Sequence, residues 1–361
     1  MRAVVLGARG AVGRSCVAQL LTAGVEVLAV GRDATQVAAA CPGARIHPGL
    51  DLEDLLFGNQ SSGAIADLLV DADVVVCCAG PSHRYSEAVA RLVLEAGVRF
   101  VDPGAEGLVP VLSPLAAASG TSALLGAGVQ PGLVGLAVTV ATARLGQPPR
   151  QVHGWCGGLQ PLTLAGIQEY LHAAQQGNRV GTMLARGRHV AVRPEQTPPP
   201  PAPFPPSAVA HSHLDEEAED RARASGSEHL HWANVTDGAV TATVLGRCLG
   251  GDASVQEAIA AARTDLFGRQ PYFHILVEAT DGRERSWARV SCTDSYAATG
   301  AVCAATALVT DAPPGAHNAC SHTDPAASWN RLADMLAPRV RLSLGVGPGF
   351  GETATIEEGE L

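Results

Sequence analysis

The sequence contains no lysine: the 25 residues counted as Lys or Arg are all arginine. A chain without lysine cannot form a Schiff base through a side-chain amine. It also cannot supply the phosphate-binding lysine of a P-loop, and the Tyr-x-x-x-Lys pair of short-chain dehydrogenases is impossible. A proton donor in this protein must therefore be His, Tyr, Asp, Glu, Cys or water.

The sequence also lacks a long uninterrupted apolar run and the cysteine spacing of a disulfide framework. The most apolar segment, residues 124–143, is interrupted by Gln130-Pro131-Gly132, so we interpret it as a strand, a loop and a buried helix rather than a membrane span. Nine cysteines, an odd number without framework spacing, are typical of a reducing cytosol. Met1-Arg2 leads directly into a predicted strand, so no signal peptide is expected. We therefore expect a soluble cytoplasmic protein with no membrane partner.

Charge and length limit the classes of function further. The formal net charge of −10 argues against nucleic acid as a partner, because phosphate contacts need concentrated basic surface. Of the 361 residues, 47% are hydrophobic and 17% are charged, which indicates a compact globular protein. Because the chain exceeds the usual size of a single domain, two domains are expected.

The first thirteen residues carry the most informative motif. A short apolar run ends in three glycines spaced three apart, and a helical pattern begins directly afterwards. Glycines let a backbone approach an anion closely, and a helix N-terminus offers free N–H groups and a positive dipole. The spacing, G-x-x-G-x-x-G rather than G-x-G-x-x-G, keeps the turn and adds a guanidinium beside the phosphates. We predict a dinucleotide pyrophosphate site formed by Gly7, Arg9, Gly10, Ala11, Val12 and Gly13.

The end of the second predicted strand indicates which dinucleotide binds. The strand stops at Gly31-Arg32-Asp33, about 20 residues past the last glycine, where such folds contact the adenosine ribose. Arginine accommodates a 2′-phosphate there, whereas an acidic residue hydrogen-bonds the ribose hydroxyls of NAD. Arg32 comes first and Arg9 can converge on the same spot, so the sequence favours NADPH. Asp33 keeps NADH as the alternative.

Residues 1–125 alternate between predicted strands and helices. Several of the strands are continuous apolar runs, as in a parallel sheet covered on both faces. The predicted strands are 2–7, 25–30, 73–79, 98–102 and 122–126, and the predicted helices are 11–23, 34–40, 61–70, 84–96 and 110–119. The pattern predicts an α/β fold with an N-terminal Rossmann-type doubly wound parallel sheet. Ligands bind at the carboxyl edge of such a sheet, so we expect cofactor contacts from Cys78, Ala79, Gly80 and Pro81.

After Gly126 the rhythm changes. The predicted strands are 152–155, 188–192, 239–245, 272–279 and 285–292, and the predicted helices are 163–176, 253–265, 294–309 and 326–336. Asp281-Gly282 is the turn signal of a hairpin, so we predict a second, α+β domain with a largely antiparallel sheet. The expected organisation is a dinucleotide-binding domain at 1–125, a substrate and dimerisation domain at 126–322 with a Pro-rich loop at 197–206, and a C-terminal helix and tail at 323–361.

Four sequence blocks together resemble the saccharopine dehydrogenase-like oxidoreductases. They are the glycine turn, Val76-Cys-Cys-Ala-Gly80-Pro81 with Tyr85, Gly97-Val-Arg-Phe-Val-Asp102-Pro-Gly-Ala-Glu106, and Gly126-Ala-Gly128-Val-Gln-Pro131-Gly132. Their order and spacing agree over roughly the first 135 residues, although Phe100 and Ala105 replace the family's usual Tyr and Gly. The resemblance implies an NAD(P)-dependent, dimeric oxidoreductase with a cleft between its domains. Relatives reduce C=N bonds, and trans-acting members reduce C=C bonds on carrier-bound chains.

Candidate catalytic and substrate-binding groups follow from these positions. His83 and Tyr85 follow the predicted strand 73–79, at the position where the nicotinamide should lie. Either side chain could deliver a proton as hydride arrives. His153 is a rival donor and Trp155, on the same strand face, a stacking platform. Each candidate also has a structural interpretation. His83 could be an exposed histidine, Tyr85 could cap the following helix, and His153 and Trp155 could pack together in the core. Asp102 is expected to contact the cofactor and, with Glu106, to shape the cofactor loop; a structural role for Glu106, bracing the interdomain turn, is the alternative to ligand contact. The expected substrate contacts are Glu106, Gln130, Trp155 and Gln168, with Tyr170 and His172 as weaker candidates.

Three functions remain open from the sequence. The first is an NADPH-dependent reductase of an imine, either small or tethered to a carrier protein, and the second is a trans-acting enoyl reductase. The third is a non-catalytic NADP(H)-binding sensor or scaffold. The pairs His211/His213 and His229/His231 superficially suggest a metal site, but no Cys pair or His-Glu-x-x-His motif accompanies them, so no metal is expected.

Overall fold

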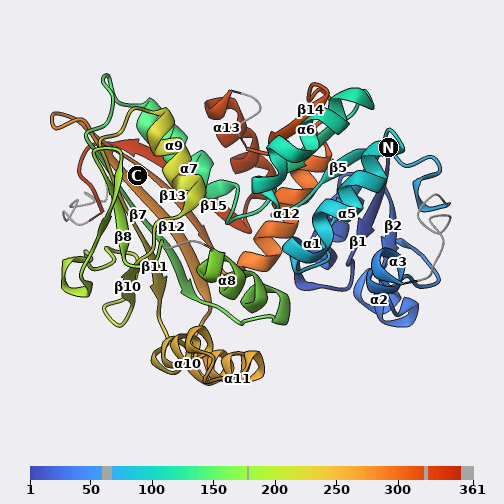
Figure 1. Cartoon of the computed structure of the whole chain (residues 1–361), viewed down its shortest axis with the longest axis horizontal. Coiled ribbons are helices and arrows are strands. Elements are labelled where there is room, and N and C mark those ends of the chain that lie inside the picture. Colours follow the sequence, from blue (N-terminus) through green and yellow to red (C-terminus); the bar gives the residue numbers. More distant parts are fainter. Residues whose placement is uncertain (59–66, 177–178, 321–323, 351–361) are drawn as a thin grey trace, which may run out of the picture. The chain divides into compact units, whose positions relative to one another are not determined.

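The computed structural model describes residues 1–58, 67–176, 179–320 and 324–350, which form two compact units (Figure 1). The first unit comprises residues 1–133 and 294–340, and the second comprises residues 134–293 and 341–361. No helix within the described ranges is long and apolar enough to cross a membrane.

The first unit is built on a seven-stranded sheet whose strands all run parallel, in the order β14-β6-β5-β4-β1-β2-β3. Its strands are β1 (Arg2–Leu6), β2 (Glu26–Val30), β3 (Arg45–Ile46), β4 (Val74–Cys77), β5 (Arg99–Val101), β6 (Ser122–Leu125) and β14 (Gly315–Asn318). Its helices are α1 (Ala11–Thr22), α2 (Ala34–Ala40), α3 (Leu52–Phe57), α5 (Ser82–Glu95), α6 (Val109–Ala118), α12 (Ser295–Ala307) and α13 (Pro325–Leu336), with a 3-10 turn at Glu106–Leu108. The predicted doubly wound sheet is confirmed.

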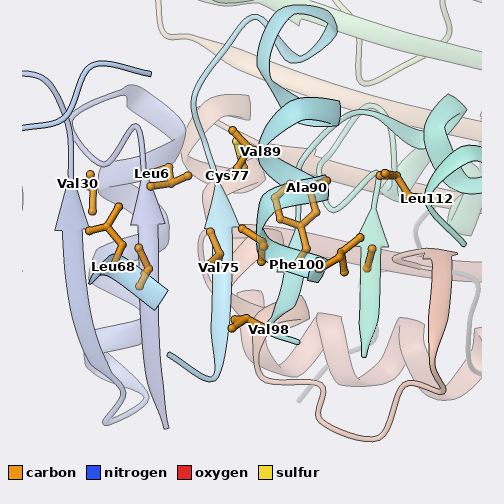
Figure 2. Packing of buried hydrophobic residues seen from close by; sticks show 14 of the residues in the cluster. Leu6, Val30, Leu68, Val75, Cys77, Val89, Ala90, Val98, Phe100 and Leu112 are labelled. Carbon is orange, nitrogen blue, oxygen red and sulfur yellow. The ribbon is translucent and has the colours of Figure 1, made fainter. Parts of the chain in front are cut away.

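Continuous apolar strands explain the main core of this unit. Val75 and Cys77 of β4 and Phe100 of β5 are at most 1% exposed, and Figure 2 shows Val89 and Ala90 of α5 facing them. Strands buried in this way must be apolar on both faces, because helices cover the sheet from both sides. The core therefore fixes β1 and β4 side by side, with their carboxyl ends at one edge.

Residues 294–340 belong to the first unit, whereas the sequence assigned them to the second domain and the tail. The reason is a close contact between α12 and α1. The Ser15 hydroxyl donates a hydrogen bond of 2.7 Å to the carbonyl of Ala297. A Cβ on Gly300 would lie 2.3 Å from the Val12 carbonyl oxygen, so only glycine lets the two helices approach this closely.

The second unit has an eight-stranded, largely antiparallel sheet in the order β15-β13-β12-β7-β11-β8-β9, with β10 beside β11. Only β7 and β11 are paired in parallel among the strand pairs whose register is defined. The strands are β7 (Gln151–Leu159), β8 (Thr182–Ala185), β9 (Arg188–Ala191), β10 (Val209–Ser212), β11 (His229–Thr236), β12 (Tyr272–Thr280), β13 (Arg285–Cys292) and β15 (Val340–Val346). The helices are α7 (Leu133–Ala143), α8 (Leu164–Gln176), α9 (Glu216–Ala224), α10 (Ala239–Gly250) and α11 (Val255–Leu266), with a 3-10 turn at Pro194–Gln196.

One predicted strand of this unit, 239–245, is wrong, because the segment forms the helix α10. Its β-branched residues favoured a strand, but the carboxylate of Asp265 on α11 accepts hydrogen bonds from the backbone N–H and the hydroxyl of Thr241, both at 2.7 Å. A cap supplied from another helix is not visible in the local sequence. Strands β8, β10, β11 and β15 of this unit were not predicted, nor were β3 and β14 of the first unit.

Two predictions fall partly outside the described residues. Of the helix expected at 61–70, residues 61–66 lie outside them, and residues 67–69 are helical. Of the expected C-terminal tail, residues 351–361 lie outside them. The Pro-rich loop at 197–206 is confirmed as neither helix nor strand, and its Phe204 is buried against Trp155 and Leu276 of the sheet.

Candidate functional site

The turn between β1 and α1 can be built only with glycine. Gly7 has a φ of +69°, and a Cβ there would lie 2.7 Å from the backbone nitrogen of Ala79. A Cβ on Gly13 would lie 2.3 Å from the carbonyl oxygen of Gly7. Both distances are far below van der Waals contact, so side chains are excluded and the backbone is left open to an anion.

The N-terminus of α1 follows this turn without a competing group. Within the described residues, no side chain caps it and its first turn has no acidic residue. Arg9 and Arg14 flank it and are exposed. Unpaired N–H groups with a positive dipole and two nearby guanidinium groups form an electropositive site of the kind that binds phosphates.

Arg32 and Asp33, which follow the carboxyl end of β2, lie in different surroundings. Asp33 caps α2: its Oδ1 accepts the backbone N–H of Gln36 at 3.0 Å and its Oδ2 accepts the Gln36 side-chain N–H at 2.6 Å. These hydrogen bonds, with the charge of Arg9 nearby, hold the pKa of Asp33 below its ordinary value. Arg32 is exposed and has no ion-pair or side-chain hydrogen-bond partner among the described residues. Arg32 is thus available to a ligand, while Asp33 is engaged locally.

The segment leaving β4 places a group of thiols under the glycine turn. Cys78 is half-buried, while Cys16 on α1 and Cys303 on α12 are fully buried. Hydrogen bonds from the thiols of Cys16 and then Cys303 lower the pKa of Cys78 to about 5, against the opposing effect of burial. The Cys303 thiol donates a hydrogen bond of 3.1 Å to the carbonyl oxygen of Ala127, which leaves Cys16 as the main donor to Cys78. Gly80 is exposed and Pro81 is buried. The segment that follows β4 is therefore partly accessible to a ligand at the edge of the sheet.

Asp102 lies beneath this edge rather than on it. It is 1% exposed; its Oδ2 accepts the Ser86 hydroxyl at 2.7 Å and its Oδ1 accepts the backbone N–H of Gly104 at 2.9 Å. The expected role of shaping the loop fits this burial, and direct contact with a cofactor does not. Ala105 in the same loop has a φ of +61°, which explains the glycine that the family pattern has there.

The two proton-donor candidates after β4 lie in different surroundings. His83 is exposed in the first turn of α5. The Tyr85 hydroxyl donates a hydrogen bond of 2.7 Å to Glu53 of α3, which also pairs with Arg84. Burial, followed by the negative charge of Glu53, raises the pKa of Tyr85. Tyr85 thus holds its proton more tightly than an ordinary tyrosine.

The turn after β6 is also shaped by glycine. A Cβ on Gly132 would lie 2.4 Å from the carbonyl oxygens of both Gly126 and Gly128. Gln130 is exposed at the tip of this turn. Glu106 lies against the turn, since a Cβ on Gly126 would be 3.5 Å from the Glu106 Cβ. This position matches the bracing role considered for Glu106.

In the second unit, His153 and Trp155 share one face of β7, as predicted. Their rings are 5.7 Å apart, and His153 also lies 5.9 Å from the ring of His231 on β11. Burial lowers the pKa of His153 to about 4, with smaller effects from His231 and Arg285. His153 is therefore neutral at pH 7. Trp155 is 6% exposed and packs in the core cluster with Phe204, which is the structural reading of this residue.

Helix α8 carries the remaining candidates. Gln168, Tyr170 and His172 are all half-buried. Tyr170 lines a cavity with residues of β10, β11 and α10. The sequence reasoning considered His211 and His213 only as metal ligands and did not consider Asn234 or Thr236, although all four line this cavity. The consecutive polar residues His211, Ser212 and His213 gave no alternating pattern, and the strand that carries the first two of them was not predicted.

Comparisons with known proteins agree with this geometry. Residues 7–101 match the family model described as NAD(P)H-binding. Saccharopine dehydrogenase (L-Glu forming) from Saccharomyces cerevisiae matches with a TM-score of 0.67 at 15% identity, over 96% of this chain and 100% of that chain. The WlbA (WbpB) dehydrogenase from Thermus thermophilus, in complex with NAD and UDP-GlcNAcA, covers 75% of this chain and 95% of its own at 14% identity, but its TM-score of 0.37 is too low to carry an argument. A search of curated proteins gave no significant match.

Residues 7–101 of the first unit are thus similar to NAD(P)H-binding domains. The chain as a whole has the fold of saccharopine dehydrogenase, so the resemblance inferred from the four sequence blocks is confirmed at the level of the fold.

Proposed function

We propose that the protein is an NADPH-dependent reductase that transfers hydride to the C=N bond of a small or carrier-tethered, amino-acid-derived substrate. The observation that carries the proposal is the side-chain-free turn at Gly7 and Gly13, followed by the uncapped N-terminus of α1. This turn lies in a domain that matches an NAD(P)H-binding family model, within a fold shared with a saccharopine dehydrogenase.

The choice of NADPH over NADH rests on the end of β2. Both oxygens of the Asp33 carboxylate already accept hydrogen bonds from Gln36, so this group is poorly placed to take the ribose hydroxyls. Arg32 is exposed, and Arg9 is close enough to Asp33 to lower its pKa. Two guanidinium groups near the ribose position favour the additional phosphate of NADPH.

The bound dinucleotide would supply the hydride, and the chain would bind, orient and protonate. Gly7, Gly10 and Gly13 would hold the pyrophosphate, and Arg32 the 2′-phosphate. We propose His83 as the proton donor, because it is exposed in the first turn of α5 at the edge where ligands of such sheets bind. The Tyr85 hydroxyl already donates its hydrogen bond to Glu53, and His153 is neutral at pH 7. Because some imines protonate in water, proximity and orientation can contribute most of the rate.

Calorimetry and steady-state turnover test the proposal. We expect binding heat with NADPH and a weaker signal with NADH, and oxidation of NADPH with a cyclic imine such as 1-pyrroline. Oxidation with an enoyl thioester such as a crotonyl thioester, but not with imines, would identify an enoyl reductase instead. Binding without turnover of any imine or enoyl substrate would favour a sensor or scaffold. No heat with either nucleotide would overturn the proposal as a whole.

Location and assembly are part of the same proposal. Nine free cysteines among the described residues suit a reducing compartment such as the cytoplasm. We propose a homodimer, as the family resemblance implies. Light scattering on the purified protein tests this: a mass near twice 36.9 kDa supports the homodimer, and a mass near 36.9 kDa contradicts it.

A further inference from the structure

A small cavity in the second unit is lined by polar side chains from three elements and by an apolar side chain from a fourth. Tyr170 comes from α8, His211 from β10, Asn234 and Thr236 from β11, and Leu245 from α10; Val180, Ser212 and His213 complete the lining. Asn234 and Thr236 are two apart on one strand and therefore on one face, and His211 is the antiparallel partner of Asn234. The strand register thus brings their side chains to the same spot.

Several of these polar groups make no side-chain hydrogen bond among the residues that the structure describes. The Oδ1 atom of Asn234 is buried and accepts no hydrogen bond in the described part of the chain. Over the same residues, the Tyr170 hydroxyl and the rings of His211 and His213 have no side-chain hydrogen bond. Ser212 differs, because its hydroxyl bonds to Thr197 and to His231, both at 2.7 Å. Buried polar atoms are satisfied in nearly all proteins, so the unsatisfied Oδ1 atom of Asn234 calls for an explanation.

The lining indicates the charge of a ligand. None of the eight lining residues is an arginine, aspartate or glutamate. Burial lowers the pKa of His213, an effect that Asp215 only partly offsets, so this ring adds no firm positive charge. A second cavity of the same unit is different, since it is lined by Arg150, Arg186 and Glu228. Carboxylates and phosphates are bound by arginine, lysine or backbone N–H groups, which suits the second cavity and not the first.

The size and the donor set define the chemical class. The cavity has a volume of about 110 Å³, less than the roughly 150 Å³ of a cavity that holds benzene. Its lining includes an orphan acceptor, Asn234 Oδ1, and the hydroxyl donor of Tyr170. A carboxamide has two N–H donors and one acceptor oxygen, carries no charge, and matches this set.

We propose that the cavity between α8, β10, β11 and α10 is a binding site for an uncharged carboxamide group, with Asn234 accepting from its N–H and Tyr170 donating to its oxygen. The site lies wholly within the second unit. The inference therefore stands independently of whether the first unit supports reduction.

Saturation-transfer NMR with propionamide and propionate tests the proposal on the full-length protein. We expect saturation transfer to propionamide and at least tenfold weaker binding of propionate. Asn234→Leu removes the orphan acceptor at similar volume, and Tyr170→Phe removes only the hydroxyl; each should weaken propionamide binding roughly tenfold or more. Asn330→Leu, an exposed site on α13 of the first unit, is the matched control and should bind like the wild type.

Every outcome decides the proposal. Absence of propionamide binding to the wild type would overturn it, as would equal binding of propionate or unchanged binding in Tyr170→Phe. Circular dichroism checks that Asn234→Leu is folded, and Tyr170→Phe keeps the test valid if it is not. NADPH calorimetry on the same variants should be unchanged, so failure at this cavity and failure of the dinucleotide site are told apart.

Discussion

The backbone nitrogen of Ala79 lies 2.7 Å from the position that a Cβ on Gly7 would occupy. This contact joins the first turn of the chain to the segment leaving β4. Both segments border the edge where we place the dinucleotide. The site is therefore held by backbone packing rather than by side-chain contacts.

Gly7→Ala should abolish nucleotide binding, because the new methyl group must displace the Ala79 backbone and the residue must keep a φ of +69°. Gly24→Ala is the matched control: it has a φ of +75°, but nothing lies within 4 Å of its Cβ. It should lose about 1 kcal/mol of stability through backbone strain and bind NADPH normally. Calorimetry and thermal melting measure both effects, and equal binding by the two variants would contradict the assignment.

Arg32→Ala should weaken NADPH binding about 10- to 100-fold and NADH binding much less, because one charge-assisted contact to the 2′-phosphate is lost. Titration of intrinsic or nucleotide fluorescence measures the ratio. Arg339→Ala, another exposed arginine of the first unit, should leave both affinities unchanged. If Arg32→Ala reduced both affinities equally, its role at the 2′-phosphate would be refuted.

Cys78 should react with iodoacetamide almost as fast at pH 6 as at pH 8.5. Because hydrogen bonds from Cys16 and then Cys303 lower its pKa to about 5, the thiolate already predominates at pH 6. Mass spectrometry after short labelling follows each cysteine. Replacing Cys16 and Cys303 by alanine should restore a steep pH dependence, and saturating NADPH should slow labelling. A steep rise with pH in the wild type would contradict the prediction.

Stability should fall as the pH drops from about 6.5 to 4. Burial lowers the pKa of His153 to about 4, with smaller effects from His231 and Arg285, and burial and Arg289 lower that of His274 to about 4. Because the unfolded chain binds these protons at higher pH than the folded chain, protonation favours unfolding in this window, by up to about 1.4 kcal/mol per pH unit for each group. Urea unfolding at several pH values measures the slope. His274→Gln should reduce it, and an unchanged slope would show that His274 does not contribute.

Asp237 should be essential for the second unit. This carboxylate is 1% exposed and accepts hydrogen bonds from Ser207 at 2.7 Å and Tyr272 at 2.8 Å, besides pairing with Arg269. Asp237→Ala leaves three polar groups without their partner and should cost about 3 kcal/mol. Asp220→Ala, an exposed aspartate on α9, should change stability by less than about 0.5 kcal/mol. Urea unfolding of both variants gives the comparison.

Elements that depend on residues close together in the chain could be predicted from the sequence, whereas elements that depend on distant residues could not. The glycine turn, the strands β1, β2, β4, β5 and β6 and the hairpin of β12 and β13 depend on neighbours in the chain, and they were predicted. The short elements β3 and α3 were not. The helix at α10 was not, because its cap comes from Asp265, 24 residues past Thr241. The packing of α12 on α1 depends on Gly300 and Val12, which no local pattern connects. The carboxamide cavity likewise depends on the register of β10 and β11.

The return of residues 294–340 to the first unit has a consequence for biosynthesis. When the ribosome has made only residues 1–133, α1 lacks the helix that covers it and β6 has an open edge where β14 will pair. The first unit thus cannot complete its folding until residues 134–293 of the second unit have been translated. Residues 1–133 expressed alone should form an aggregation-prone fragment. Residues 1–133 fused to 294–340 through a short linker should fold as a stable unit.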